Sequence, residues 1–313
     1  MRGLVIGRRR LALGVAAAWM CVTLVGCGSA AQHRTAPASL PESARAVVSA
    51  PVRIAHTRLG AVGYRVVGTG PPLILITGYT ATMDDWDPRF VGALAEHYRV
   101  VIFDNAGVGR TQALPAPLTI DAMANQTSAL IGALGLGRPD VLGWSMGGTI
   151  AQALAVLHPA RVRSLVLCAT FPGTGKIAPP SQAAVRALTS GNVQEMMADL
   201  FPANQAAAQQ AHLAATAAYP PHAPAPAATI TAQEDAMNMW LDGTDPAGQK
   251  TATISAPTLI ADGSTDRLDP VANDQALARL IRGARLKLYP DAGHAFLFQD
   301  ENAFVPLIES FLR

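Results

Sequence analysis

One serine of this chain lies in a pattern that can turn a hydroxyl into a nucleophile. Residues 143–147 match G-x-S-x-G, in which the central serine, Ser145, occupies a sharp turn between a strand and a helix. A Cβ two residues before or after that serine would clash in such a turn, so we expect Gly143 and Gly147 to be required there. An apolar strand-like run precedes the motif and the helix-forming segment 149–157 follows it, which is the context that the motif requires.

A serine hydroxyl is a weak nucleophile and needs a base, and Asp266 and His294 can supply the remaining groups. A hydrogen-bonded imidazole removes the hydroxyl proton during attack, and a carboxylate holds the imidazole in the useful tautomer. Each of the two residues follows an apolar strand-like run, 258–260 for Asp266 and 286–289 for His294. We therefore predict Ser145 as nucleophile, His294 as base and Asp266 as the acid that orients it.

Three other aspartates compete with Asp266 for the role of acid. Asp262 stands nearer to the end of its strand and is the runner-up, Asp269 better suits the cap of a helix that opens near residue 270, and Asp291 lies beside the histidine loop. The other histidines of the domain lie in segments that we interpret as edge strand, helix or cap, and are His56, His97, His158, His212 and His222.

The composition allows a large α/β domain and gives no reason to expect a nucleic-acid partner. Of 313 residues, 50% are hydrophobic and 15% are charged, so a sizeable core can form. The formal net charge of +2 owes four positive charges to arginines before residue 27, and the remainder carries −2. No set of His, Cys and carboxylate residues has metal-ligand spacing, and Gly107-x-Gly109 lacks the third glycine of a dinucleotide fingerprint. We therefore expect no metal and no cofactor.

The first 26 residues have the features of a lipoprotein signal peptide. A basic stretch, 8–10, precedes an apolar run, 11–25, that is shorter than the roughly 20 residues needed to span a bilayer. Residues 24–27, Leu-Val-Gly-Cys, resemble a bacterial lipobox, which implies cleavage before Cys27 and attachment of lipid such as palmitate to it. We therefore expect a protein held at the outer face of the cell membrane by lipid on Cys27, exported by the Sec or the twin-arginine route. An ordinary signal peptide with an incidental cysteine is the alternative.

The rest of the chain alternates strand-like and helix-like segments. Residues 27–51, rich in Ala, Ser and Pro, predict a flexible tether, and two strand-like segments around Gly60 predict a hairpin. Continuous apolar runs that suit buried strands occupy 73–76, 99–103, 141–142, 165–167, 258–260 and 286–289. Helix-like stretches occupy 90–96, 120–134, 149–157, 271–281 and 304–312. This alternation predicts a mostly parallel, eight-stranded sheet with helices on both faces.

The region of about 171–253 interrupts the alternation, because it has helix-like pieces (181–188, 193–200, 205–218 and 232–241) and no buried strand. A segment of this length needs its own structure, so we predict a small helical cap within the domain 52–313. Its larger apolar residues either face a substrate or pack the cap onto the sheet, and are Met196, Met197, Phe201, Met237, Met239 and Trp240.

These features together resemble the α/β-hydrolase family, in the branch with a helical cap between the sixth and seventh strands. The resemblance covers 52–313 and includes the order serine, aspartate, histidine. Gly263, Asp266 and Pro270 match the family's Gly-x-x-Asp-x-x-x-Pro pattern, which favours Asp266 over Asp262.

The resemblance also implies an oxyanion hole made by the backbone N–H groups of Met146 and of Tyr79, in the loop after the third strand. The Tyr79 side chain either contacts substrate or packs. Two positions depart from the family: Thr77 stands where relatives often have histidine, and Ala106 stands where arginine is usual. Since the oxyanion donor is a backbone amide, we expect Thr77 to be tolerated.

The expected activity is hydrolysis of carboxylic esters through an acyl-enzyme. Relatives with the same triad act on lactones, amides or carbon–carbon bonds, or serve as cofactor-free haloperoxidases and perhydrolases. Epoxide hydrolases and dehalogenases are disfavoured, because they have aspartate where Ser145 stands. A non-catalytic envelope binding protein is the third class, against which the complete triad argues.

Cys168 lies in an apolar run and is expected in the core rather than as a nucleophile.

Overall fold

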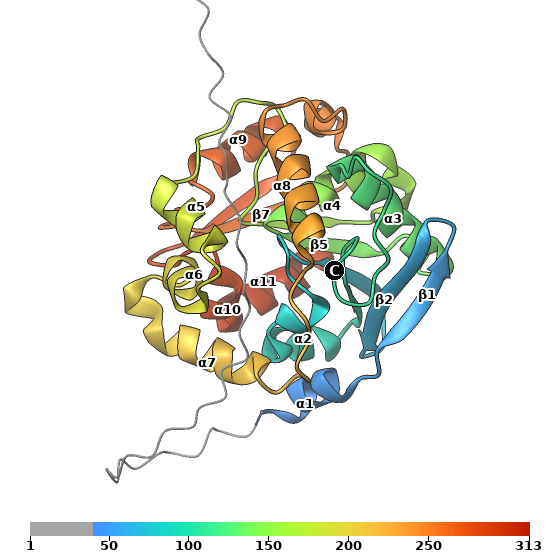
Figure 1. The fold of residues 1–313 in the computed structure, drawn as a ribbon, viewed down its shortest axis with the longest axis vertical. Helices are drawn as coiled ribbons and strands as arrows, with labels where there is room; N and C mark the ends of the chain where they lie inside the picture. The colour runs from blue at the N-terminus through green and yellow to red at the C-terminus, as the bar shows by residue number, and fades with distance from the viewer. Residues whose placement is uncertain (1–39) are drawn as a thin grey trace, which may run out of the picture.

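The computed structural model describes residues 40–313, which fold around one eight-stranded sheet (Figure 1). The strand order is β1-β2-β4-β3-β5-β6-β7-β8, and only the β1–β2 and β2–β4 pairs are antiparallel. The strands are β1 (Arg53–Thr57), β2 (Gly60–Val67), β3 (Pro72–Ile76), β4 (Arg99–Phe103), β5 (Asp140–Trp144), β6 (Leu165–Cys168), β7 (Thr258–Gly263) and β8 (Arg285–Tyr289). The predicted sheet and its hairpin around Gly60 are confirmed.

Helices cover both faces of the sheet. Successive side chains of a strand point to opposite faces, so a strand that is apolar throughout must be covered on both sides. In β3, Leu73 and Leu75 join one hydrophobic core, whereas Ile74 and Ile76 join the other. The first core is completed by α1 (Glu42–Ser49), α2 (Pro88–Ala95), α10 (Phe296–Gln299) and α11 (Glu301–Leu312), and the second by α3 (Ile120–Ala133), α4 (Met146–Leu157) and α9 (Ala272–Leu280). Fully apolar runs such as that of β3 are therefore explained by burial on both sides.

The predicted tether is wrong for residues 42–49, which form α1. This helix lies beside α2 in Figure 1, with Ala44 and Val47 buried. Gly92 lets the two helices approach closely, since a Cβ there would lie 2.8 Å from the Ala44 nitrogen. Two small apolar residues at spacing i, i+3 are a weak signal in sequence, and they become stable only through packing on α2. The packed domain thus begins ten residues before the expected boundary at residue 52.

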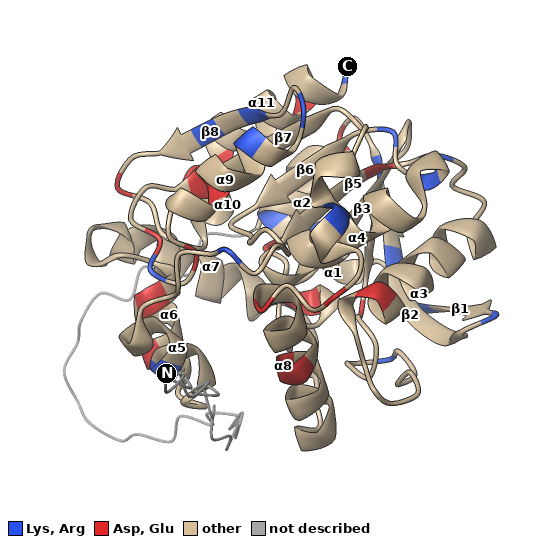
Figure 2. Cartoon of the chain, turned by 90° about the horizontal axis from the view of Figure 1, so that it is seen from above, with Lys and Arg blue, Asp and Glu red and all other residues tan. Residues whose placement is uncertain are grey.

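The segment between β6 and β7 contains the expected helices and no strand. These are α5 (Gln182–Thr189), α6 (Val193–Leu200), α7 (Ala206–Thr216) and α8 (Ala227–Leu241), with α8 beginning before the predicted residue 232. Figure 2 shows α8 and the α5–α6 pair projecting from the same side of the sheet domain. The short 3₁₀ helices of the chain are η1 (Met83–Asp85), η2 (Pro159–Arg161), η3 (Ala203–Gln205) and η4 (Gly248–Thr253).

The predicted signal peptide and Cys27 lie outside the described residues, as does the part of the predicted tether before residue 40. Within residues 40–313, none of the helices combines the length and the hydrophobicity that crossing a bilayer requires.

Candidate active site

Ser145 occupies a strained turn between β5 and α4. Its φ and ψ are 57° and −123°, a conformation that non-glycine residues rarely adopt. A Cβ on Gly147 would lie 2.0 Å from the Ile76 carbonyl oxygen, and a Cβ on Gly143 would lie 2.3 Å from the Gly147 carbonyl oxygen. The steric reason for glycine at both positions is therefore present in the fold. The backbone N–H of Ser145 donates to the Cys168 carbonyl at 2.9 Å, which ties the turn to β6.

His294 and Asp266 form a buried pair at the carboxyl ends of β8 and β7. The Nδ1 of His294 lies 2.6 Å from Oδ2 of Asp266, and both side chains are almost completely inaccessible to solvent. The other Asp266 oxygen, Oδ1, accepts hydrogen bonds from the backbone N–H groups of Leu268 and Asp269 at 2.7 and 2.9 Å. These contacts orient the carboxylate, which leaves Nε2 as the imidazole nitrogen able to exchange a proton.

The competing aspartates do not contact His294 in this way. Asp262 accepts from the Gly263 backbone N–H at 2.6 Å, and Asp269 accepts from the Asn273 side chain at 2.8 Å. Asp291 is exposed and has a φ of 58°. The structure therefore brings Asp266, and none of its three competitors, to the histidine.

Sequence reasoning missed a cluster of buried carboxyl groups that interact electrostatically with Asp266. Single oxygens of Asp262, Asp269 and Asp274 all lie within 4.8 Å of one another in the described part of the chain. Burial, together with the neighbouring carboxylates, raises the pKa of all three, and that of Asp274 to about 8. Protons shared within the cluster would relieve the repulsion. The positions of these aspartates in the sequence gave no sign of the cluster, because Asp262 lies in β7 and Asp274 reaches it from α9.

The expected oxyanion donors lie beside Ser145. Met146 is the first residue of α4, so its backbone N–H has no acceptor within the helix. Gly78 precedes Tyr79 in the loop after β3, and a Cβ on Gly78 would lie only 3.3 Å from the Ser145 Cβ. Glycine thus allows this loop to approach the serine closely, as an oxyanion donor from this loop requires.

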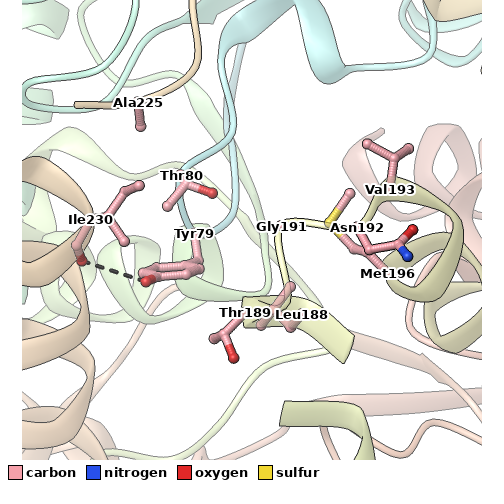
Figure 3. A pocket seen from close by; sticks show the side chains of 10 residues that line it. All are labelled: Tyr79, Thr80, Leu188, Thr189, Gly191, Asn192, Val193, Met196, Ala225 and Ile230. Carbon is pink, nitrogen blue, oxygen red and sulfur yellow. Dashed lines mark hydrogen bonds between the residues drawn. The ribbon is translucent and has the colours of Figure 1, made fainter. Parts of the chain in front are cut away.

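Ser145 and His294 line one cavity of about 620 Å³, which lies between the sheet domain and the cap. Its walls are mostly apolar, and Phe171 and Leu268 contribute from the sheet side. A smaller cavity of about 40 Å³ shares Tyr79, Leu188 and Thr189 with the large one and is also lined by residues of the α5–α6 junction (Figure 3). A substrate group of substantial apolar area therefore fits next to the nucleophile.

The cap contributes residues that sequence reasoning only partly identified. One face of α8 lines the large cavity with Glu234, Met237, Asn238 and Leu241, and the C-cap residue Asp242 continues it. Their helical spacing, i, i+3, i+4, i+7 and i+8, is the signal that could have identified this face. Met237 thus faces the cavity, as one of the two interpretations predicted.

Most of the other large cap residues pack inside the protein. Met197, Phe201 and Trp240 are buried in the two cores, in agreement with the packing interpretation. Met196 lines the smaller cavity.

Cys168 is fully buried in β6, and burial raises the pKa of its thiol. A nucleophilic cysteine needs access and a stabilised thiolate, so this residue serves the core.

Comparison with known proteins gives the same picture of the fold. A protein of Caulobacter sp. (strain K31), assigned provisionally as carbamate hydrolase RutD, is 28% identical over 265 residues, covering 80% of this chain and 95% of the relative. An esterase structure from Thermogutta terrifontis is 25% identical with a TM-score of 0.64, covering 84% of this chain and 98% of that one. An enol-lactonase structure from Burkholderia xenovorans LB400 is 25% identical with a TM-score of 0.66, covering 83% and 99%.

The family model described as alpha/beta hydrolase fold matches residues 71–301, which include Ser145, Asp266 and His294. With its eight-stranded, mostly parallel sheet and its hydrolase relatives, the chain belongs to the α/β-hydrolase fold family and is a hydrolase of that family.

Proposed function

We propose that this hydrolase cleaves carboxylic esters through an acyl-enzyme on Ser145. One observation carries the proposal: a serine on a strained strand–helix turn shares a largely apolar cavity with a histidine that is paired to a buried aspartate. The similarity to an esterase structure supports the choice of bond. The apolar lining favours esters with an apolar acyl or alcohol group.

The first half of the reaction transfers the acyl group to the enzyme. The Ser145 oxygen attacks the ester carbonyl carbon while Nε2 of His294 takes the hydroxyl proton. The carbonyl π electrons move to the oxygen, and the backbone N–H groups of Met146 and Tyr79 would stabilise that negative charge. When the tetrahedral intermediate collapses, the bond to the alcohol oxygen breaks and His294 returns the proton to the leaving alcohol.

The second half regenerates the enzyme with water as the nucleophile. His294 takes a proton from water as the water attacks the acyl carbon, and then gives a proton to Ser145 as the acid product leaves. The Asp266 carboxylate accepts the Nδ1 hydrogen bond throughout and stabilises the imidazolium that forms twice in each cycle. The route therefore needs no metal and no cofactor.

The proposal is tested by replacing the nucleophile alone. Purified protein lacking residues 1–27 should be labelled by a fluorophosphonate probe and should hydrolyse p-nitrophenyl esters, and Ser145→Ala should lose both properties. Ser164→Ala, which removes a hydroxyl from a buried serine just before β6, is the matched control and should keep both. Ester hydrolysis that persists in the Ser145 variant would refute the assignment.

Ring opening of a lactone is a second candidate, because the enol-lactonase structure has a similar fold and the same tetrahedral chemistry applies. A panel of acyl esters of increasing chain length and of lactones, compared by kcat/KM, separates the two. Preference for lactones would replace the ester proposal while leaving the roles of the triad unchanged.

We also propose that the protein acts at the outer face of the cell membrane, held by lipid on Cys27. The support is the basic stretch, the short apolar run and the lipobox-like residues 24–27. In a bacterial host, the full chain should enter the detergent phase on Triton X-114 partitioning and incorporate labelled palmitate. Cys27→Ser should do neither, and equal partitioning of the two chains would refute the anchor.

A further inference from the structure

The expected oxyanion donor, the backbone N–H of Tyr79, belongs to a peptide plane whose orientation depends on the residues before and after it. That plane joins Gly78 to Tyr79, and a Cβ at residue 78 would lie only 3.3 Å from the Ser145 Cβ. Glycine permits many backbone conformations, so the direction of the Tyr79 N–H must be set by contacts on either side.

The preceding peptide plane is held from the sheet domain. The Asn105 side-chain Nδ2 donates to the Thr77 carbonyl at 3.0 Å and lies 3.1 Å from the Thr77 hydroxyl oxygen. Asn105 is 2% exposed and follows β4. The Thr77 hydroxyl in turn donates to the Ala81 carbonyl at 3.2 Å, which closes the loop on itself.

The following peptide plane is held from the cap. The Thr80 backbone N–H donates to Oε1 of Gln233 at 2.8 Å, across a sequence separation of 153 residues. Gln233 lies on α8 and is 0% exposed. Thr80 has a φ of 58°, an outlier for a β-branched residue, so surrounding contacts must stabilise this conformation.

A second contact between the same loop and α8 is drawn in Figure 3. The Tyr79 hydroxyl donates to the Ile230 carbonyl at 3.4 Å, one turn before Gln233 on the helix. Burial, with a smaller contribution from the Glu234 carboxylate, raises the pKa of Tyr79 to about 12, so the hydroxyl keeps its proton near neutral pH. The loop is therefore bound to the cap through both a side chain and the backbone.

We infer that Gln233 is a positioning residue for the oxyanion hole, which is completed by the cap as well as by the sheet domain. Asn105 and Gln233 fix the peptide planes before and after the one that carries the Tyr79 N–H, so this donor points at the oxyanion only while α8 is docked. The inference rests on the proposed serine-hydrolase function. Because the negative charge exists only in the transition state and the tetrahedral intermediate, loss of Gln233 should lower kcat with little change in KM.

The test compares Gln233→Met with Thr229→Val in the otherwise intact chain. Methionine keeps the length of the side chain and removes the acceptor for Thr80. Valine at position 229 removes the hydroxyl that donates to the Gly107 carbonyl at 3.0 Å, another contact of α8 with the sheet domain, and leaves the oxyanion loop untouched. Gln233→Glu keeps an acceptor oxygen in either protonation state and serves as the rescue variant.

Gln233→Met should lose on the order of 10- to 100-fold in kcat, since misplacing a catalytic donor by about 1 Å can cost 10²-fold. Its KM should stay within about twofold of wild type, and a boronic acid that mimics the tetrahedral intermediate should bind more weakly by the same factor as kcat. Thr229→Val should resemble the wild type, and Gln233→Glu should lie closer to wild type than Gln233→Met does.

Three results would overturn the inference: unchanged kcat in Gln233→Met, an equal loss in Thr229→Val, or a loss confined to KM. The rate of fluorophosphonate labelling gives a second readout that needs no ester substrate, and thermal denaturation identifies a variant that fails to fold. Failure of the proposed function is seen separately, as absence of labelling in the wild-type protein.

Discussion

His294 lies 2.6 Å, Nδ1 to Oδ2, from Asp266, and the other oxygen of that carboxylate is held by two backbone N–H groups. The carboxylate thus fixes both the orientation and the tautomer of the imidazole. Asp266→Asn should lower kcat on the order of 10³–10⁴-fold, because an amide favours the wrong tautomer. Steady-state hydrolysis of a p-nitrophenyl ester measures the loss.

Asp262→Asn is the matched control, since this side chain is also buried, lies four residues earlier in β7 and binds the Gly263 backbone instead. It should retain activity within a few-fold of wild type. If Asp262→Asn were as inactive as Asp266→Asn, the assignment of the acid to Asp266 would be contradicted.

Gly147→Ala should unfold or strongly destabilise the protein. The new Cβ would lie 2.0 Å from a backbone oxygen of β3, which cannot move without disturbing the sheet, so we expect a loss of about 3 kcal/mol or more in the free energy of unfolding. Urea denaturation followed by circular dichroism measures it. Gly132→Ala is the control, because this exposed position in α3 meets no atom closer than 3.5 Å and should gain up to about 1 kcal/mol. Equal stability of the two variants would count against the steric account of the turn.

Asp274→Asn should remove part of the pH dependence of stability. Burial raises the pKa of this carboxyl from 3.8 to about 8, so the folded state binds more protons than the unfolded state between these values. Its contribution to stability is complete below the unfolded pKa and is lost as the pH rises through the folded pKa. The variant should therefore gain stability relative to wild type as the pH rises from about 4 to about 8.

Urea denaturation at several pH values checks this expectation. Asp235→Asn removes a carboxyl from the exposed side of α8 and is the control. A constant difference between Asp274→Asn and wild type at all pH values would contradict the proton-sharing account of the cluster.

Met237→Trp should shorten the substrate cavity, because Met237 lines it from α8. We expect kcat/KM for long-chain acyl esters to fall by about tenfold relative to acetyl esters, as a pocket discriminates by the apolar area it can accept. Met239→Trp, two residues away on the same helix and half-buried, is the control. The same loss for acetyl and long-chain esters in Met237→Trp would indicate damage to the site rather than a shorter cavity.

The strands and the meeting of Ser145, Asp266 and His294 could be predicted from sequence because their signals are local. Buried parallel strands require continuous apolar runs, as in β3, and a strained turn excludes Cβ atoms around Ser145. The order of Ser145, Asp266 and His294 along the chain, each after a strand, indicated that they meet at one edge of a parallel sheet. The α1 helix was missed because its two buried residues form a signal too short to recognise without α2.

Sequence by itself thus determined the fold class, the residue types of the site and the elements that carry them. The sequence pattern favoured Asp266, and the tertiary structure agrees, because among Asp262, Asp266 and Asp269 it is the Asp266 carboxylate that reaches His294. Only the tertiary structure joined Thr80 to Gln233 and gathered Asp262, Asp269 and Asp274. Such contacts depend on how elements far apart in the sequence pack against each other, and a local pattern of residues does not predict that packing.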